Sequence, residues 1–160
     1  MKILPIETSR ILKNKKKLEA RLNVKLSKRG KDIVIEGKEE DEYIADKVLE
    51  AINFGFKLEQ ALLLKDENYV FEEIYIKNLT KRKDLHRIRA RIIGKNGMTK
   101  KNIENLSNCL ICLKDNVVGI IGQTEDIRQG INAITNLIQG SKQGSVYGFL
   151  ERCKKNFQKA

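Results

Sequence analysis

Two glycines flank a lysine and an asparagine in the turn Gly94-Lys95-Asn96-Gly97 of this 160-residue chain. Because glycine has no Cβ atom, the backbone of such a turn can lie very close to another chain. Lys95 adds a positive charge, and Asn96 tolerates the positive φ that tight turns often require. Backbone N–H groups of the turn, together with the start of the helix predicted behind it, would face phosphate groups. These residue types therefore indicate contact with an anionic chain.

Residues that could support catalysis or bind metal are few. The only histidine, His86, lies in a basic segment without a partner for acid–base chemistry, so we expect it at the surface or facing a phosphate. Cys109 and Cys112 have the spacing of half a zinc site, but no second pair of cysteine or histidine residues completes the four ligands. We expect both to be small buried thiols in a reducing compartment. The sequence therefore predicts a protein that is not an enzyme and that needs no metal or cofactor.

Positive charge is concentrated in the segment that leads to the turn. The 32 lysines and arginines outnumber the 21 aspartates and glutamates, which gives a net charge of +11. Ten basic residues and a single acidic one, Asp84, lie from Lys77 to Lys101. Such a segment is either ordinary solvated surface or a binding face for a polyanion, and its continuity with the turn favours the polyanion. No apolar run reaches the roughly 18 residues that span a bilayer, so we expect a cytoplasmic protein without membrane contact.

An internal repeat organises the elements that must position the turn. A shift of 85 positions places Gly55 on Gly140 without a gap, whereas a shift of 81 places Arg10 on Arg91. The first copy is therefore four residues shorter, and the missing residues are those of the glycine turn. The other matched positions at the longer shift are Leu18 with Ile103, Glu19 with Glu104, Asn23 with Asn108, Ile33 with Val118, Ile35 with Ile120, Gly37 with Gly122, Leu49 with Ile134 and Ile52 with Leu137.

Each copy is predicted to form a strand, two short helices, two strands and a long helix. Thr124 is the expected cap of the last long helix, and Pro5 restricts the first strand to the edge of its sheet. In the first copy the elements are expected at 2–6, 9–12, 15–22, 24–27, 32–36 and 40–52, followed by a helical connector at 56–64. In the second copy they are expected at 69–76, 85–93, 99–107, 109–113, 117–121 and from 124, followed by a helical tail at 145–160.

This order of elements around a glycine turn resembles the KH fold. Both copies show the order, and together they cover nearly the whole chain. It implies the α+β class, with two tandem type I KH domains whose three-stranded antiparallel sheets are packed by helices. The expected domains are a degenerate KH domain without the turn at 1–58, a connector at 59–68, and a KH domain with the turn and a C-terminal helix at 69–160. KH domains clamp about four nucleotides of single-stranded nucleic acid against such a turn.

The second copy supplies the residues for this mode of binding. The turn would face phosphates, four isoleucines would form an apolar floor for the bases, and flanking basic residues would hold further phosphates. Because the region has no tyrosine or phenylalanine, base stacking should be weak and binding should depend steeply on salt. The predicted RNA-binding residues are Arg87, Arg89, Arg91, Ile92, Ile93, Gly94, Lys95, Asn96, Gly97, Lys100, Lys101, Ile103 and Ile111.

Three segments narrow the resemblance further. Residues 89–101, residues 51–62 and residues 144–151 are similar, in order and spacing, to the archaeal KH protein of small-subunit ribosome assembly, whose eukaryotic relative is called partner of Nob-one. The resemblance implies binding to the 3′ region of small-subunit ribosomal RNA. It also implies two protein partners, the endonuclease that trims that RNA end and the alpha subunit of translation initiation factor two.

Two other functions remain compatible with the sequence. One is a general KH binder of messenger RNA or single-stranded DNA, and the other is a protein-interaction scaffold that binds no nucleic acid. The role of the first copy is also open, because it has lysines at 13 and 15–17 where a glycine turn would stand. It either holds RNA through charge or serves as a docking platform, and the lack of glycines favours the platform.

Overall fold

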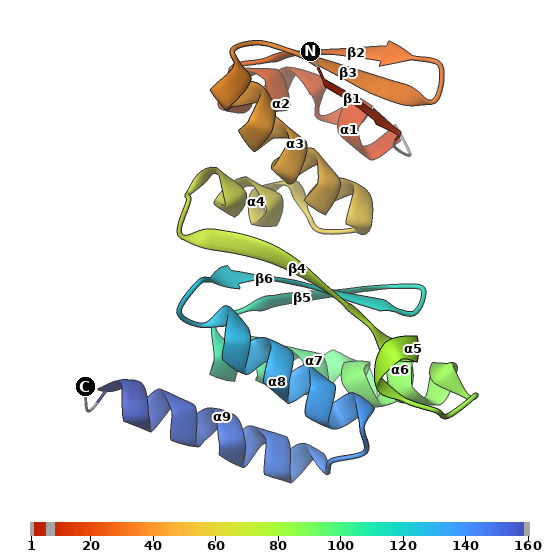
Figure 1. Cartoon of the computed structure of the whole chain (residues 1–160), viewed down its shortest axis with the longest axis vertical. Helices are drawn as coiled ribbons and strands as arrows, with labels where there is room; N and C mark the ends of the chain where they lie inside the picture. Colours follow the sequence, from red (N-terminus) through yellow and green to blue (C-terminus); the bar gives the residue numbers. More distant parts are fainter. Residues whose placement is uncertain (1, 6–8, 159–160) are drawn as a thin grey trace. The chain divides into compact units, whose positions relative to one another are not determined.

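The computed structural model describes residues 2–5 and 9–158, which form two compact units divided between residues 67 and 68. Each unit contains a three-stranded antiparallel sheet accompanied by helices (Figure 1). The predicted α+β class is therefore confirmed. Ile6, the expected last residue of the first strand, lies outside the described residues.

The first unit has the strand order β1-β3-β2, so β1 lies at an edge as Pro5 requires. The long helix α3 packs against β3 and against the helices α1 and α2. The core of the first unit consists of aliphatic side chains such as Ile11, Leu18, Ile33 and Leu49, all with no exposed surface. The elements are β1 Lys2–Pro5, α1 Ser9–Lys13, α2 Lys15–Leu22, β2 Lys25–Arg29, β3 Asp32–Glu36, α3 Glu39–Phe54, α4 Leu58–Ala61 and the 3₁₀ helix η1 Leu62–Lys65.

The second unit repeats this plan with the strand order β4-β6-β5. Its buried side chains are mostly isoleucines, and they lie between the sheet and the helices α6, α7 and α8. The last helix, α9, packs on α7 and α8 through the buried residues Val146 and Leu150. The elements are β4 Tyr69–Tyr75, α5 Ile76–Leu79, α6 Leu85–Ile93, the 3₁₀ helix η2 Lys95–Gly97, α7 Met98–Ser107, β5 Leu110–Lys114, β6 Val117–Gln123, α8 Ile127–Ile138 and α9 Gln143–Gln158.

Two details of the predicted elements are corrected. The strand β4 ends at Tyr75, and Ile76 begins the short helix α5 instead of continuing the strand. Helix α8 begins at Ile127 behind Asp126, so Thr124 does not cap it. The backbone N–H of Thr124 instead donates to the carbonyl of Asn68, at 2.9 Å, because the chain is still leaving the sheet at this point.

The internal repeat is visible in the local geometry of both units. The strand pairs place Leu26 opposite Ile35 in the first unit and Ile111 opposite Ile120 in the second, which is the same register after the 85-residue shift. The helices α2 and α7 both end at an asparagine in the left-handed conformation, Asn23 with φ 56° and Asn108 with φ 57°. At the junction of its two short helices, α6 and α7, the second unit therefore differs from the first by the added glycine turn.

Among the described residues, no helix is long and apolar enough to cross a membrane, and no three histidine, cysteine or acidic side chains are grouped as metal ligands.

Candidate nucleic-acid interface

The glycine turn joins two helices and leaves two of its amides without a partner in the turn itself. Helix α6 ends at Gly94, whose N–H donates to the carbonyl of Ala90 at 2.8 Å. The N–H of Gly97 donates to the carbonyl of Gly94 at 3.2 Å, and α7 begins at the next residue. These two bonds close the turn without using the amides of Lys95 and Asn96, which are both exposed residues. An external acceptor can therefore meet two adjacent N–H groups at the start of α7.

The two glycines are required for different reasons. Gly94 has φ 76° and ψ 175°, and a Cβ atom built there would lie 2.7 Å from the backbone nitrogen of Thr99. Gly97 has φ 73°, but a Cβ atom there would meet nothing within 4 Å. Gly94 is thus fixed by packing against the buried Thr99 in the first turn of α7, whereas the space around Gly97 is open. Asn96, between them, adopts the left-handed conformation with φ 55°, as its residue type allows.

The expected apolar floor is corrected by the structure. Ile92 and Ile103 have no exposed surface and Ile111 has 3%, because all three fill the core of the second unit. Only Ile93, the last residue of α6, exposes a substantial part of its side chain, 39%. A base could therefore lie on Ile93, while the other three isoleucines support the surface from beneath.

Arg91 is also placed differently from the prediction. Its guanidinium donates to the carbonyl of Leu137 at 3.0 Å and to the carbonyl of Ser141 at 2.6 Å. Leu137 belongs to the last turn of α8, and Ser141 lies in the segment that follows the helix, so the arginine fork bridges both. Arg91 therefore ties α6 to the end of α8, and this group is not available to a phosphate.

The other arginines of α6 are available. Arg89 is half-buried, and its buried Nε–H has no hydrogen-bond partner within the described residues. A buried donor of this kind is unfavourable until an acceptor reaches it, which makes Arg89 the side chain of this helix best prepared for an anion. Arg87 is exposed and lies 3.9 Å from Asp84, a contact that contributes little at such exposure.

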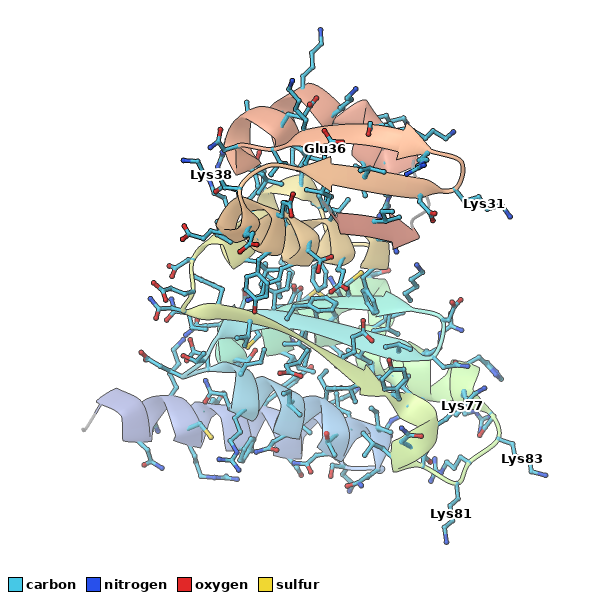
Figure 2. All side chains as sticks on the ribbon, turned by 45° about the horizontal axis from the view of Figure 1, so that its top comes forward. Lys31, Glu36, Lys38, Lys77, Lys81 and Lys83 are labelled. Carbon is cyan, nitrogen blue, oxygen red and sulfur yellow. The ribbon has the colours of Figure 1, made fainter. Side chains whose placement is uncertain are left out.

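Basic side chains extend from the surface on both sides of the turn. Lys95 and Lys101 are exposed, and neither forms an ion pair with another described residue. Lys77, Lys81 and Lys83 reach outward from the segment that leads into α6 (Figure 2). The predicted concentration of positive charge is thus presented to solvent around the turn.

Glu104 is a residue that sequence reasoning missed. One carboxylate oxygen lies 3.3 Å from the ammonium of Lys100, and the other accepts the backbone N–H of Ile111 at 3.1 Å. Lys100 is therefore paired within the protein, and the edge amide of β5 at Ile111 is occupied. The internal repeat contained the signal, because Glu19 accepts the N–H of Leu26 at 3.3 Å in the first unit.

The described thiols do not form a metal site. Burial raises the pKa of the Cys109 thiol to about 11, so the group stays protonated at neutral pH. Its sulfur packs where Gly122 and Gly130 leave room for it. Cys112 and Cys153 are also free cysteines, and both are half-buried.

Comparisons with known proteins agree on one family. A family model described as the eukaryotic type KH domain (KH-domain type I), for the second KH domain of PNO1, matches residues 70–155. A KH domain-containing protein of Methanocaldococcus jannaschii is 32% identical over 114 residues, covering 71% of this chain and 50% of that protein. The pre-rRNA-processing protein PNO1 of Saccharomyces cerevisiae is 40% identical over 106 residues, covering 64% of this chain and 38% of that protein. The chain thus spans half or less of the length of these two relatives.

A solved structure supports the same relationship over the full fold. A chain of the crystal structure of the a/eIF2alpha–aDim2p–rRNA complex from Pyrococcus horikoshii OT3 superimposes with a TM-score of 0.86 and 31% identity, covering 97% of this chain and 94% of that one. The family model matches more than half of the residues described above, including the whole glycine turn. The chain therefore belongs to the PNO1-type family of KH-domain proteins.

Proposed function

We propose that the chain binds single-stranded RNA at the turn Gly94–Gly97 and acts as a non-catalytic factor in the processing of small-subunit ribosomal RNA. The observation that carries the proposal is the pair of amides of the exposed residues Lys95 and Asn96, which the two hydrogen bonds of the turn leave unused, beside the open space at Gly97. Phosphate oxygens are strong acceptors, and two adjacent N–H groups at a helix start suit one phosphate. The named relatives that process pre-rRNA and the relative whose complex contains rRNA support the RNA and its class.

The charges around the turn give a path for the strand. Lys95 would lie next to the phosphate that the turn binds. Arg89, in the preceding helix, would offer its unpartnered Nε–H to a neighbouring phosphate. Arg87 and Lys101 are exposed and complete the cationic border on either side. Only Ile93 of the four predicted isoleucines, together with Met98 after the turn, offers an exposed apolar surface to a base. Phosphate contacts should therefore dominate the affinity, and binding should weaken steeply with salt.

We further propose that the chain consists of two tandem KH domains. The matching registers of the two sheets and the shared asparagine caps support this assignment. In this scheme the degenerate domain occupies 1–58, a connector occupies 59–68, and the domain with the turn occupies 69–160. The helices α4 and η1, which fall in the connector, pack on α3 and so belong structurally with the first unit.

The proposed RNA target is the 3′ region of small-subunit ribosomal RNA, in the cytoplasm. The proposed protein partners are the endonuclease that trims this region and the alpha subunit of translation initiation factor two. The related complex that contains a/eIF2alpha and rRNA supports the second partner. A non-catalytic role is consistent with the exposed position of His86, the single histidine, at the surface of α6.

The double variant Lys95→Asp with Asn96→Asp tests the RNA site. It places two carboxylates where a phosphate would lie, so RNA affinity should fall at least about tenfold. The matched control is Lys154→Asp with Asn156→Asp, which makes the same charge change at exposed positions near the end of α9. Fluorescence anisotropy with a labelled RNA of the ribosomal 3′ end measures both, and circular dichroism checks that both variants fold.

Two alternative functions predict different results. A general binder would hold random single-stranded RNA or DNA as tightly as the ribosomal 3′ end in a competition experiment. A protein scaffold would show no RNA binding in the wild-type chain, or binding that the turn variant and its control reduce equally. Either result would refute the proposed function.

A further inference from the structure

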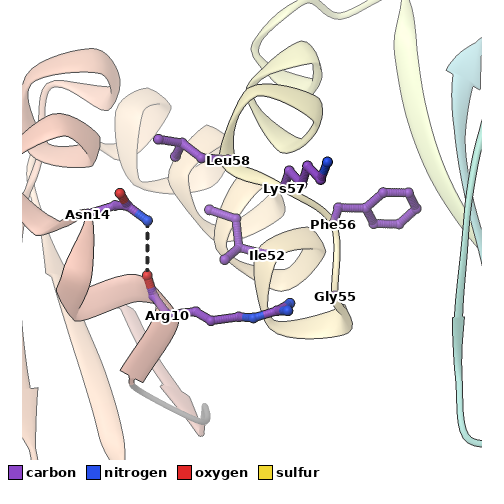
Figure 3. Close-up of a pocket in the computed structure, with 7 residues that line it drawn as sticks. All are labelled: Arg10, Asn14, Ile52, Gly55, Phe56, Lys57 and Leu58. Atoms are coloured by element: carbon purple, nitrogen blue, oxygen red, sulfur yellow. Dashed lines mark hydrogen bonds between the residues drawn. The ribbon is translucent and has the colours of Figure 1, made fainter.

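A hollow in the first unit lies where the second unit has the Arg91 contact. It has a volume of about 250 Å³, and it lies between α1 with the following Asn14, the end of α3 and the start of α4 (Figure 3). An ordered water takes up about 30 Å³, so the hollow holds several waters, yet it is smaller than a typical pocket for a drug-sized ligand. Its lining residues are Arg10, Asn14, Ile52, Gly55, Phe56, Lys57 and Leu58, all from the first unit.

The internal repeat shows what is unusual about this place. Arg10 corresponds to Arg91, whose guanidinium is fully engaged with the carbonyls of Leu137 and Ser141. Figure 3 shows the side chain of Arg10 extending from α1 towards the end of α3 at Gly55. The Arg10 guanidinium nevertheless forms no hydrogen bond or ion pair with another described residue. The second unit therefore uses this arginine internally, whereas the first unit leaves it facing a hollow.

The surroundings of the hollow are strongly cationic. Lys57 lines it, is exposed and has no acidic partner among the described residues. Helices α1 and α2, from Ser9 to Leu22, carry six basic residues and one acidic residue, Glu19. The carboxylate of Glu19 accepts the backbone N–H of Leu26, and Glu59, which follows Leu58, pairs with Lys17 at 3.1 Å. The lining thus combines two cations that have no acidic partner among the described residues with the apolar side chains of Ile52 and Leu58.

We infer that this hollow is a second binding site for the RNA strand, which takes one phosphate with part of its nucleoside. The guanidinium of Arg10 and the ammonium of Lys57 would hold the phosphate, because unpaired cations at a concave surface attract an anion. The apolar part of the lining would contact the sugar or the base. The first unit would then contribute to RNA affinity although it lacks a glycine turn, and it would not be a docking platform alone. This inference rests on the proposed function, since it assigns a second contact to the same ligand.

Two RNA lengths separate the sites in the full-length chain. We expect a tetranucleotide to bind mainly at the glycine turn, whereas a 16-nucleotide RNA of the ribosomal 3′ end can reach further cations. The test variant is Arg10→Ala with Lys57→Ala. The matched control is Lys28→Ala with Arg29→Ala, which removes the same charge from exposed positions of the β2–β3 hairpin in the same unit.

We expect the hollow variant to bind the 16-nucleotide RNA about tenfold more weakly and the tetranucleotide as wild type does. Its plot of log affinity against log salt for the longer RNA should be shallower by about 0.7, the contribution of the one phosphate that the hollow holds. The control should change neither quantity. Equal effects of the hollow variant and the control on the longer RNA would overturn the inference.

Further measurements keep the test decisive. The charge-preserving variant Arg10→Lys with Lys57→Arg should bind the longer RNA almost as wild type does. If the alanine variant does not fold, crosslinking of 4-thiouridine RNA to the wild-type chain replaces it. Crosslinks to α1 or to the segment 57–58 support the site, and crosslinks confined to the second unit overturn it. If wild type binds neither RNA, the proposed function fails. If wild type binds the tetranucleotide but its affinity for the 16-nucleotide RNA does not depend on Arg10 and Lys57, only the hollow is refuted.

Discussion

Gly94→Ala should mainly lower the stability of the protein, whereas Gly97→Ala should mainly lower its RNA affinity, although both residues belong to one four-residue turn. At Gly94 a new Cβ atom would lie 2.6 Å from Cβ of Thr99 and 2.7 Å from its backbone nitrogen. Thr99 is buried in the first turn of α7, so the overlap can be relieved only by moving that helix. At Gly97 nothing lies within 4 Å of the added atom.

The expected magnitudes follow from these two environments. Alanine in the left-handed conformation of Gly97, with φ 73° and ψ 12°, costs about 1–2 kcal/mol. Gly94, with φ 76° and ψ 175°, lies in a region that other residues scarcely adopt, and the overlap with Thr99 adds an overpacking term. Together they make Gly94→Ala about 4 kcal/mol less stable than wild type. The lower unfolded-state entropy of alanine is common to both variants and cancels in their comparison.

Urea unfolding followed by circular dichroism measures the stabilities, and anisotropy with a labelled tetranucleotide measures the affinity. Gly94→Ala should lose most of its stability, while Gly97→Ala should stay folded and bind RNA at least about tenfold more weakly, because its methyl group enters the space assigned to the strand. If Gly94→Ala were as stable as Gly97→Ala, the packing argument would be wrong. If Gly97→Ala bound RNA normally, the strand could not lie against that backbone.

Two further variants test the contacts around the turn, and a third tests the buried thiol of Cys109. Arg91→Ala removes two charge-assisted hydrogen bonds at the end of α8, so urea unfolding should show a loss of about 2–4 kcal/mol in stability. RNA affinity of the folded variant should be normal, whereas a reduced affinity would make Arg91 a phosphate ligand. Glu104→Gln should release Lys100 and strengthen RNA binding a few-fold in low-salt anisotropy; weaker binding would instead make the carboxylate part of the site. The buried Cys109 has a pKa near 11, raised from 9.0, so folding favours its protonated form and stability should fall by up to about 1.4 kcal/mol per pH unit from pH 9 to 11. Cys109→Ala should flatten that pH dependence in urea titrations, and an unchanged slope would assign it to other groups.

Local features of the fold were accessible from the sequence because they depend on neighbouring residues. The helix at 85–93 ends where Gly94 interrupts it, and the structure gives the same bounds. The strand at 32–36 was likewise predicted with its observed bounds, since a short β-branched run lies between turn residues. Pro5 fixed the position of β1 at an edge, because proline lacks a donor.

The parts of the site that the sequence did not disclose depend on distant contacts. Arg91 carries the same charge as Arg87, and only the meeting of α6 with the end of α8, 46 residues away, reveals its structural use. Apolar periodicity places Ile92 and Ile103 on inner helix faces, but it does not say whether a groove stays open above them. In the structure, neither residue has any exposed surface.

The comparison of the two units argues against a purely structural role for the glycine turn. In the first unit Asn14 alone joins α1 to α2, and its side chain closes the junction by donating to the carbonyl of Arg10 at 3.2 Å. The second unit joins the equivalent helices with four residues, of which three have positive φ. A linker of one residue therefore suffices to build the same sheet register and helix order. Since this helix order does not require the longer turn, its three residues with positive φ and the unused amides of Lys95 and Asn96 support the proposed RNA site.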